Sequence, residues 1–502
     1  MPTPPPIAEE FLRDTSQDHR LHETHFNRRR PVIKSTLDGS EFRSLREIED
    51  LHSPDGFIRL VTTYFRAASG SKLHVAHGQY FDFDHIISRV LGVAGLNSSF
   101  SSQVYGGGKG LELSNAYISA MGEGVERVLG SFAFLSWAER MRYGSRRELQ
   151  RSGLNCLGPE DIPLFAEQQF EDPHFLFDRW DDDSFLGWIP GKRLYSGEEV
   201  WVPAQLVLFT YYRNQDEPLI GLAPSGGLAC HVSTDRAVYH ALDELIERDA
   251  VNLRWHAGVP LDRIVLDVPL RDKKLEAAIR DLQDGVGTPQ FYLQNMDFME
   301  FPVITAVQFD DWLPELIYNA GGGVGPSPDH AMRSALGEYC QSERTLRICQ
   351  QTENWQFRSS FERLFGIHPD AKPYEFLRFV QAITYYGYPE NARKADWYFR
   401  DGQEVLLSDL YKVVDAAEPD PIRRLHSSLQ SHNIDPIMYD FTPNSFSQTK
   451  IWKSYIPELA QPYPPQNPAL GHPRYQSVPV QAGFRSEPID QADLRTDPLP
   501  YP

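Results

Sequence analysis

Hydrophobic and polar positions along this chain follow two periods, one of two residues that is typical of strands and one near 3.6 that is typical of helices. β-Branched and aromatic residues are concentrated in residues 58–65, 200–202 and 303–309, where we expect strands. Strand-like and helix-like segments alternate from about residue 51 to residue 439. This alternation predicts a mixed α/β (α+β) fold with mixed sheets.

Three of the expected helices share one polar pattern, and each follows a glycine-rich segment that we expect to be a turn. The glycine-rich segments are residues 105–110, 225–227 and 321–325. In each helix a Ser or His is followed four positions later by Glu, and three positions after that by Glu or Gln. These residues are Ser119, Glu123 and Glu126 in the first helix, His240, Glu244 and Glu247 in the second, and Ser334, Glu338 and Gln341 in the third.

Suitable capping residues stand at the start of each of these helices. Ser233 or Thr234 can cap the second helix, and Ser327, which is followed by proline, can cap the third. Ser114 or Asn115 can cap the first. Because the spacing between the three copies is uneven, they do not fit a solenoid of short repeats. We expect a core domain that is assembled around three equivalent helices.

The acidic residues share one face of each helix, because positions i, i+3 and i+4 lie together. A single motif of this kind usually marks a solvated face with local ion pairs. Three copies favour a common site instead, at which four carboxylates converge and must be held by a cation to stay ionised. Oxygen ligands without histidine favour Mg²⁺ over zinc, and a di-iron site would need histidine within the motif. The four carboxylates are those of Glu123, Glu126, Glu244 and Glu247.

Basic residues and glycines near the acidic pairs are suited to phosphate. Arg127 and Arg248 follow the two pairs, and Lys109 lies in the first glycine-rich segment. Glycine also allows backbone N–H groups to approach an anion closely. The segment is not a P-loop, because Lys109 is followed by Gly110 and Gln103 replaces the leading glycine. The sequence therefore predicts an unusual Mg²⁺–ATP site that is built from acidic helices.

Composition and charge limit the partners and the cellular setting. The chain has 502 residues, of which 41% are hydrophobic, and this is enough for a sizeable core. A net charge of −20 disfavours nucleic acid and anionic membranes as partners. Four cysteines without metal-site spacing exclude a disulfide framework, and the first residues lack the order of a signal peptide. We therefore expect a soluble, cytoplasmic protein.

We expect three regions along the chain. Residues 1–48 form a polar N-terminal tail or arm, residues 49–445 form the ATP-binding catalytic domain, and residues 446–502 form a proline-rich C-terminal segment. Eleven prolines lie between residues 457 and 502, and proline disfavours both helices and central strands. We expect this last segment to be extended and to lie on the surface of the domain.

Several of these motifs resemble those of YcaO-domain proteins. The family's first, second and third ATP-binding motifs are matched by residues 108–110 with 119–127, residues 227–231 with 244–250, and residues 337–342. Residues 50–59 are similar to the opening segment of the SagD-type branch, which makes thiazoles and oxazoles in peptides. The chain also ends in Pro-x-Pro-x-Pro, as azoline-forming members do. The resemblance extends over roughly residues 50–502.

The resemblance implies a YcaO-type fold and an ATP-dependent cyclodehydratase that acts on a ribosomally synthesised precursor peptide. In the family, a Cys, Ser or Thr side chain attacks the preceding amide carbonyl, ATP phosphorylates the amide oxygen, and an azoline remains when phosphate leaves. It further implies that the four glutamates hold Mg²⁺ and that other residues contact ATP or the substrate. These are Lys109, Ser119, Arg127, Arg248, Glu338 and Gln341 in the nucleotide site, and Arg248 and the carboxylate of Pro502 in catalysis.

The resemblance also implies partners, and it leaves alternatives open. A leader-binding protein of the E1-like kind would be supplied in trans, and a flavin dehydrogenase and a homodimer are further expectations. A YcaO protein that forms thioamides or amidines is one alternative, and an inactive docking scaffold is another. The Pro-x-Pro-x-Pro end argues against the first alternative, and the four intact glutamates argue against the second. Two departures from the family pattern are Gly226, where an asparagine is usual, and Ser334, where many relatives have Glu.

Overall fold

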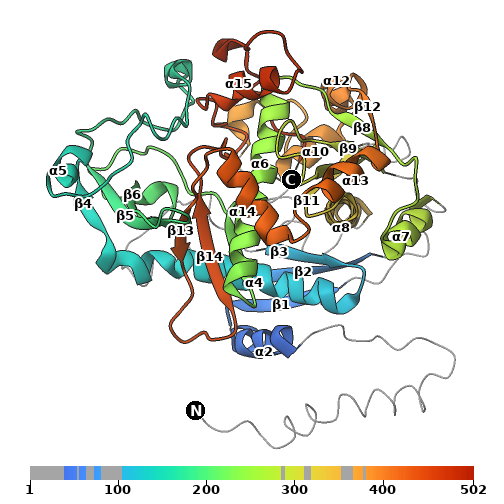
Figure 1. The fold of residues 1–502 in the computed structure, drawn as a ribbon, viewed down its shortest axis with the longest axis horizontal. Helices are drawn as coiled ribbons and strands as arrows, with labels where there is room; N and C mark the ends of the chain where they lie inside the picture. The colour runs from blue at the N-terminus through green and yellow to red at the C-terminus, as the bar shows by residue number, and fades with distance from the viewer. Residues whose placement is uncertain are drawn as a thin grey trace, which may run out of the picture.

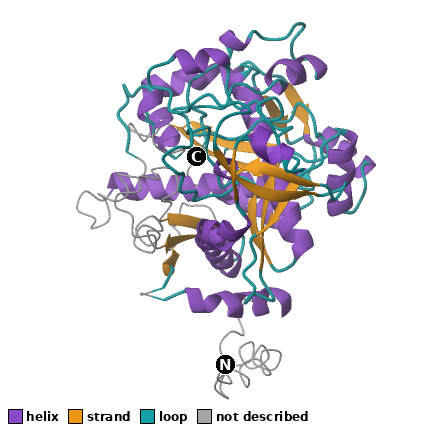
Figure 2. Ribbon diagram, turned by 90° about the vertical axis from the view of Figure 1, so that its left-hand side faces the viewer, coloured by secondary structure: helices purple, strands orange, loops and turns teal. Residues whose placement is uncertain are grey.

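The computed structural model describes residues 39–53, 56–63, 73–80, 105–283, 289–309, 318–351, 366–376 and 380–501. These residues form three sheets, and helices pack on them and between them (Figures 1 and 2). Strands and helices alternate along the chain, so the expected mixed α/β fold is confirmed.

The first sheet is small and antiparallel, and it precedes the first motif helix. Its strands run in the order β1 (Ile58–Thr63), β2 (His74–Tyr80) and β3 (Tyr105–Gly110). The long helix α4 (Leu113–Trp137) follows β3 and packs across it and across β2. The strand that we expected at residues 58–65 is present over residues 58–63, and the last two residues lie outside the described part of the chain.

The second sheet is mixed, and it precedes the third motif helix. Its order is β11 (Tyr318–Val324), β10 (Val303–Phe309), β9 (Gln290–Leu293), β8 (Asp262–Val265) and β12 (Glu404–Leu406). Only the pair of β8 and β12 is parallel within this described sheet. Helix α8 (Pro328–Gln351) follows β11 and packs on β11 and β10. β10 begins and ends at the residues that the sequence predicts.

The third sheet is antiparallel, and the second motif helix packs on its end. Its order is β4 (Arg142–Gly144), β5 (Leu186–Arg193), β13 (Ile437–Asp440), β14 (Lys450–Tyr455) and β7 (Leu228–His231), and β6 (Glu199–Pro203) pairs with β5. Helix α6 (Thr234–His256) follows β7 and packs on β14 and β7. The strand expected at residues 200–202 is confirmed within β6.

The described part of the chain contains further helices besides the three motif helices. They are α2 (Gly39–Ile48), α5 (Arg146–Arg151), α7 (Lys273–Gln283), α10 (Gln381–Gly387), α11 (Pro389–Ala392), α12 (Asp396–Arg400), α13 (Leu407–Ala416), α14 (Pro421–Ser431) and α15 (Arg474–Gln481). Within the described residues, every helix is too short or too polar to cross a membrane.

Each motif helix follows a strand at the end of its sheet. The expected glycine turns at residues 105–110 and 321–325 are wrong, because β3 and β11 occupy these positions. The glycines in β3 and β11 allow each strand to pack closely against the helix that follows it. A Cβ atom on Gly108 would lie 1.9 Å from the carbonyl oxygen of Ala116, and one on Gly321 would lie 2.1 Å from the nitrogen of Tyr339. Only the segment at residues 225–227 is a turn, and Gly227 has a φ of +78° there.

Two of the three expected helix caps are confirmed. The side chain of Ser233 accepts a hydrogen bond from the N–H of Arg236, and that of Ser327 accepts one from the N–H of His330. The caps expected at Ser114 and Asn115 are wrong, because α4 already begins at Leu113.

Most of the proline-rich segment lies outside helices and strands, as expected, but two parts of the expectation need correction. An α-helix forms in it, and about half of residues 457–501 are buried instead of lying on the surface. Helix α15 contains Pro479 near its end. The helix tolerates this proline because tertiary contacts hold it: Tyr475 is fully buried, and Arg474 pairs with Asp249 of α6. Farther along, the side chain of Tyr501 is also buried. The division of the chain into residues 1–48, 49–445 and 446–502 stays a prediction, although β14 shows that the last region contributes to a sheet.

We predict that Asp249→Asn lowers the free energy of unfolding by about 3 kcal/mol, because it removes one of the two carboxylates that balance the largely buried guanidinium of Arg474 and leaves only Asp297. Asp249 has no exposed surface, and it accepts hydrogen bonds from Arg474 Nε at 2.9 Å and from the N–H of Ala460 at 2.7 Å. Chemical denaturation measures the change. The control is Asp415→Asn, which breaks an exposed pair with Arg271 and should cost about 0–1 kcal/mol. Equal losses in the two variants would contradict the prediction.

Candidate active site

A backbone N–H group from each glycine-rich segment binds the first motif carboxylate of the helix that follows. The three bonds join Gly107 N to Glu123 Oε2 at 2.7 Å, Gly227 N to Glu244 Oε2 at 3.0 Å, and Gly322 N to Glu338 Oε2 at 3.0 Å. We call each glycine-rich segment together with the helix that follows it a unit. An end strand leaves backbone N–H groups that no neighbouring strand binds, and a carboxylate satisfies one such group in the first and third units. In the second unit the N–H group comes from the turn before β7. The same contact therefore recurs in all three units, although only one of the glycines lies in a turn.

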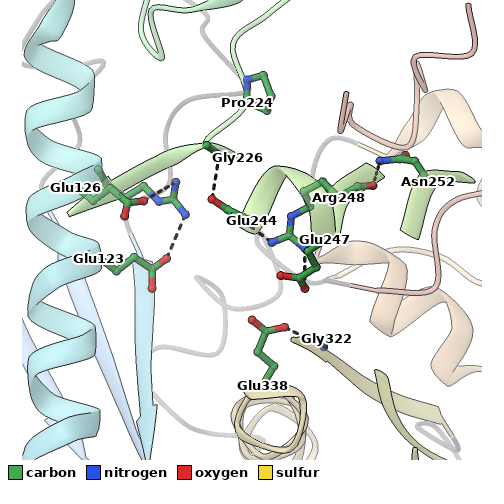
Figure 3. Close-up of polar contacts among 12 residues, drawn as sticks. Glu123, Glu126, Pro224, Gly226, Glu244, Glu247, Arg248, Asn252, Gly322 and Glu338 are labelled. Atoms are coloured by element: carbon green, nitrogen blue, oxygen red, sulfur yellow. Dashed lines mark hydrogen bonds and ion pairs between the residues drawn. The ribbon is translucent and has the colours of Figure 1, made fainter. Parts of the chain in front are cut away.

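The first two helices each carry an arginine that contacts both acidic residues of its own motif. The ion pairs join Arg127 to Glu123 at 3.4 Å and to Glu126 at 3.5 Å, and Arg248 to Glu244 at 3.5 Å and to Glu247 at 3.6 Å. In Figure 3 the two acidic pairs face each other across one space, and Glu338 approaches it from the third helix. The four carboxylates that the sequence singles out thus lie around one region.

The first and third units are joined by a lysine and by close packing. The ammonium of Lys109 in β3 lies 2.5 Å from Glu338 Oε1 in α8. Gln341 lies one turn farther along α8, directly over β3, because a Cβ atom on Gly107 would come within 1.9 Å of its Nε2. Lys109 and Gln341, both expected at the nucleotide site, therefore connect two of the three motif units.

The second unit contacts both of the others. Glu247 lies against the third unit, since a Cβ atom on Gly322 would be 2.9 Å from its Oε1. Glu126 of the first unit accepts a backbone hydrogen bond from Cys230 in β7. The contacts among the three units therefore close into a ring around the carboxylates.

Burial and like charge raise the pKa of Glu126 in this ring. Burial is the main cause of a rise to about 8, and the charges of Glu244 and Glu123 add to it. The guanidinium of Arg127 acts in the opposite direction but does not outweigh them. In the absence of a cation, the carboxyl group of Glu126 thus holds a proton near neutral pH.

In the other two helices the pKa of the motif residue Glu247 is raised and that of the motif residue Glu338 is lowered. Burial raises the pKa of Glu247 to about 7, with Arg248 opposing the rise and Glu338 adding to it. Burial acts in the same direction on Glu338, but Lys109 and Arg248 outweigh it and lower its pKa. The positive charges in the ring therefore outweigh the effect of burial on the pKa of Glu338, but they do not outweigh it on the pKa of Glu247.

The residues of the ring fit Mg²⁺. Glu247 Oε1 is buried and makes no hydrogen bond among the described residues, so it can still accept a cation. The side chains of Glu123 and Glu244 keep 28% and 27% of their surface exposed, so a ligand can reach them. Within the described part of the chain, no three His, Cys, Asp or Glu side chains form a complete metal-ligand group. Mg²⁺ commonly takes only one or two carboxylates and fills its octahedron with water and phosphate oxygens.

Cationic groups for phosphate are also present, and they are not equally available. The buried Nε of Arg127 makes no hydrogen bond within the described residues. Arg248 keeps 31% of its side chain exposed beside Glu244 and Glu247. Lys109 keeps 26% of its side chain exposed and has the shortest ion pair of the three, at 2.5 Å from Glu338. A phosphate would have to compete with a glutamate for each of these three cations.

Two of the expected site residues are not placed in the ring. Ser119 is exposed on α4, one turn before Glu123, and its contact with a nucleotide stays a prediction. Pro502 lies outside the described residues, so its expected role is not tested. The chain is described as far as Tyr501, whose hydroxyl bonds Gln294 Nε2 at 2.6 Å.

Two charged residues near the site were missed by the sequence analysis. Asp243 is buried on α6, and burial and its neighbours Glu247 and Glu244 raise its pKa strongly. Lys453 is buried in β14, close to Glu244. The position of Asp243 beside the motif was a usable signal, whereas a lysine in a strand normally faces solvent and gave none.

A sequence model of a known family matches residues 107–460 of this chain. The family is described as YcaO cyclodehydratase, ATP- and Mg²⁺-binding. A curated protein of Methanothermobacter thermautotrophicus, itself described as uncharacterised, is 27% identical over 241 residues, or 47% of this chain. This chain spans only 57% of that relative's length.

Solved structures with the same fold include three that contain ligands or partners. A heterocyclase in complex with substrate and cofactor has a TM-score of 0.68 and 16% identity over 92% of this chain and 57% of its own. YcaO from Methanopyrus kandleri, bound with AMPPCP and Mg²⁺, has a TM-score of 0.54 and 17% identity over 84% of this chain and 91% of its own. The E. coli microcin synthetase complex with pro-MccB17 bound has a TM-score of 0.54 and 14% identity over 88% of this chain and 96% of its own. With more than half of its length matched by the family model, this chain belongs to the YcaO cyclodehydratases, a family that binds ATP and Mg²⁺.

Proposed function

We propose that this protein is an ATP-dependent cyclodehydratase that converts Cys, Ser or Thr residues of a ribosomally synthesised peptide into thiazoline or oxazoline rings. The observation that carries the proposal is the ring of carboxylates from three equivalent helices, which gathers more negative charge than its arginines and lysine neutralise. A site of this kind suits Mg²⁺ together with a polyphosphate. Membership of a family described as cyclodehydratases supports the choice of reaction.

The proposed reaction transfers the γ-phosphoryl group of ATP to a peptide oxygen. The side-chain sulfur or oxygen of the substrate attacks the carbonyl carbon of the preceding amide and loses its proton. The former carbonyl oxygen then attacks the γ-phosphorus of ATP, and ADP leaves as the bond between this phosphorus and the bridging oxygen breaks. The bond between carbon and this oxygen then breaks, phosphate leaves, and the amide nitrogen loses its proton as the C=N bond of the azoline forms. The oxygen that is lost from the peptide thus leaves within phosphate.

Each residue of the ring has a part in this scheme. Bound Mg²⁺ would screen the charge of the triphosphate and of the departing ADP. The protein orients the metal through carboxylates that are already fixed by backbone N–H groups and arginines. The ligands are Glu123, Glu126, Glu244 and Glu247, the phosphate contacts are Arg127, Arg248 and Lys109, and the remaining pocket residues are Ser119, Glu338 and Gln341.

Partner proteins are part of the proposal. The peptide substrate would be presented by a leader-binding protein in trans, and a flavin dehydrogenase could then oxidise the rings. The microcin synthetase in the comparison is a complex with its pro-peptide bound, which supports both a peptide substrate and protein partners. A homodimer stays an expectation, as does the role of the Pro502 carboxylate.

The proposal is tested by incubating the protein with ATP, Mg²⁺, its leader-binding partner and the short peptide encoded in a neighbouring reading frame. Peptide-dependent release of phosphate, with loss of one water per ring by mass spectrometry, is the expected result. ATP consumption only when sulfide or an amine is added would indicate thioamide or amidine formation instead. No ATP consumption under any of these conditions would favour the inactive scaffold.

We predict that Glu247→Gln lowers peptide-dependent phosphate release by at least about a hundredfold without unfolding the protein, because the amide keeps the shape but not the charge of a metal ligand. Glu123→Gln should have a similar effect in the first helix. The matched control is Glu404→Gln in β12, which removes an exposed carboxylate and should leave the rate unchanged. A wild-type rate in Glu247→Gln would refute the metal assignment.

In the absence of Mg²⁺ and nucleotide, we predict that thermal stability falls as the pH rises from about 4.5, the usual pKa of a glutamate, to about 8, the raised pKa of Glu126. Between these two values the unfolded chain has lost the proton that the folded protein still holds, so the free energy of unfolding decreases by about 1.4 kcal/mol for each pH unit. Above the folded pKa this contribution is lost and the dependence levels off. Differential scanning calorimetry across this range should show a flatter dependence in Glu126→Gln than in the wild type. Identical pH slopes in the two proteins would mean that Glu126 is ionised throughout.

A further inference from the structure

The second unit of the site presents its backbone N–H group differently from the other two. Gly107 and Gly322 lie inside β3 and β11, where pairing with a neighbouring strand fixes the direction of each N–H group. Gly227 lies in a turn, one residue before β7 begins. The N–H group that binds Glu244 therefore depends on whatever holds this turn.

Lys453 in β14 holds the turn through two backbone carbonyl groups. Its ammonium donates to the oxygen of Gly226 at 2.6 Å and to that of Pro224 at 2.8 Å. The carbonyl group of Gly226 and the N–H group of Gly227 belong to one planar trans peptide, so they point in opposite directions. A cation that fixes the oxygen on one side thus fixes the N–H on the other side, where Glu244 accepts it at 3.0 Å.

The position of Lys453 is unusual for a lysine. Only 2% of its surface is exposed, and lysine is rarely buried to this extent. Burial lowers its pKa to about 8, although Glu244 and Glu126 act to raise it. An apolar side chain could fill the same volume without the cost of burying a charge. The ammonium therefore has a use that packing alone does not explain.

We propose that Lys453 is a positioning residue of the nucleotide site, which holds the Gly226–Gly227 peptide so that Glu244 is oriented for Mg²⁺ and ATP. The inference rests on the proposed function only in taking Glu244 as a metal ligand. Lys453 acts through the peptide and not on the reacting atoms, so its loss should change binding at the second unit and leave the first and third units intact.

Hydrogen exchange in the ligand-free protein tests the positioning step without any reaction. In Lys453→Met, the amide of Gly227 should exchange at least about tenfold faster, while the amides of Gly107 and Gly322 keep their wild-type rates. Lys450→Met, in the same strand, is the matched control and should change none of the three. An unchanged rate at Gly227, or an equal increase at all three glycines, would overturn the proposal.

Binding of Mg²⁺–AMPPCP by calorimetry tests the functional step through a double-mutant cycle. Lys453→Met should weaken binding about tenfold in the wild type and in Glu123→Gln, but by no more than about twofold in Glu244→Gln, because the last variant already lacks the carboxylate that the turn orients. Equal losses in the two Glu→Gln backgrounds would overturn the proposal.

Hydrogen exchange and nucleotide binding can still test the proposal if Lys453→Met does not fold or if the proposed ring formation is not observed. If Lys453→Met does not fold, Lys453→Gln can replace it, because its side-chain amide can still donate a hydrogen bond to one of the two carbonyl groups. This variant should show a smaller change in the same direction. Wild-type nucleotide binding in Lys453→Gln would also count against the proposal. Wild-type nucleotide binding without ring formation on any peptide would contradict the proposed reaction but not the role of Lys453.

Discussion

The site is governed by the repulsion between carboxylates that the fold buries close together. Each first motif carboxylate is held by a backbone N–H group at 2.7–3.0 Å. In the first two helices an arginine also contacts both acidic residues, and in the third helix Glu338 pairs with Lys109. These contacts do not balance the charge, because the pKa of Glu126 is raised to about 8 and that of Glu247 to about 7. The ring therefore carries excess negative charge, and under the proposed function Mg²⁺ with a triphosphate would supply the charge and the oxygen ligands that it lacks.

The architecture follows from this constraint. Each motif helix stands beside a backbone N–H group that its first carboxylate accepts, and this group comes from the end strands β3 and β11 in two cases and from the turn before β7 in the second unit. Glycine is required in β3 and β11 where the side chains of the motif helices lie directly against the strand. A Cβ atom on Gly107, for example, would overlap the side chain of Gln341. The C-terminal segment supports the same region, because Asp249, directly after Arg248, accepts hydrogen bonds from Ala460 and Arg474. The end of the chain adds to this support, as the hydroxyl of Tyr386 binds the carbonyl oxygen of Pro498.

Much of the fold and of the site could be predicted from local pattern. The strand at Val303–Phe309 and the cap at Ser233 could be predicted from the residue types in their own segments, and the repeated acidic pairs could be recognised by their spacing. The glycine segments could not be assigned correctly, because a run of glycines fits a turn as well as a strand that lies on a helix. The decision depends on contacts such as that between Gly108 and Ala116.

The remaining failures have the same long-range origin. Helix α15 forms despite Pro479 because Arg474 is held by Asp249, which lies 225 residues earlier in the sequence. Lys453 is placed behind the second motif by the pairing of β14 with β7, and nothing in its own segment distinguishes it from an exposed strand lysine. Local propensity therefore predicts where helices and strands start. Contacts with distant residues decide where a proline is tolerated inside a helix or a lysine is buried in a strand.

Isotope transfer tests the central claim most directly, namely that the ring of carboxylates positions ATP to phosphorylate a peptide amide. The precursor peptide would carry ¹⁸O in its backbone amide oxygens and be incubated with the protein, its leader-binding partner, ATP and Mg²⁺. The account predicts that each ring formed places one ¹⁸O atom in the phosphate released. Ring formation with unlabelled phosphate and the label recovered in water would contradict direct activation of the amide.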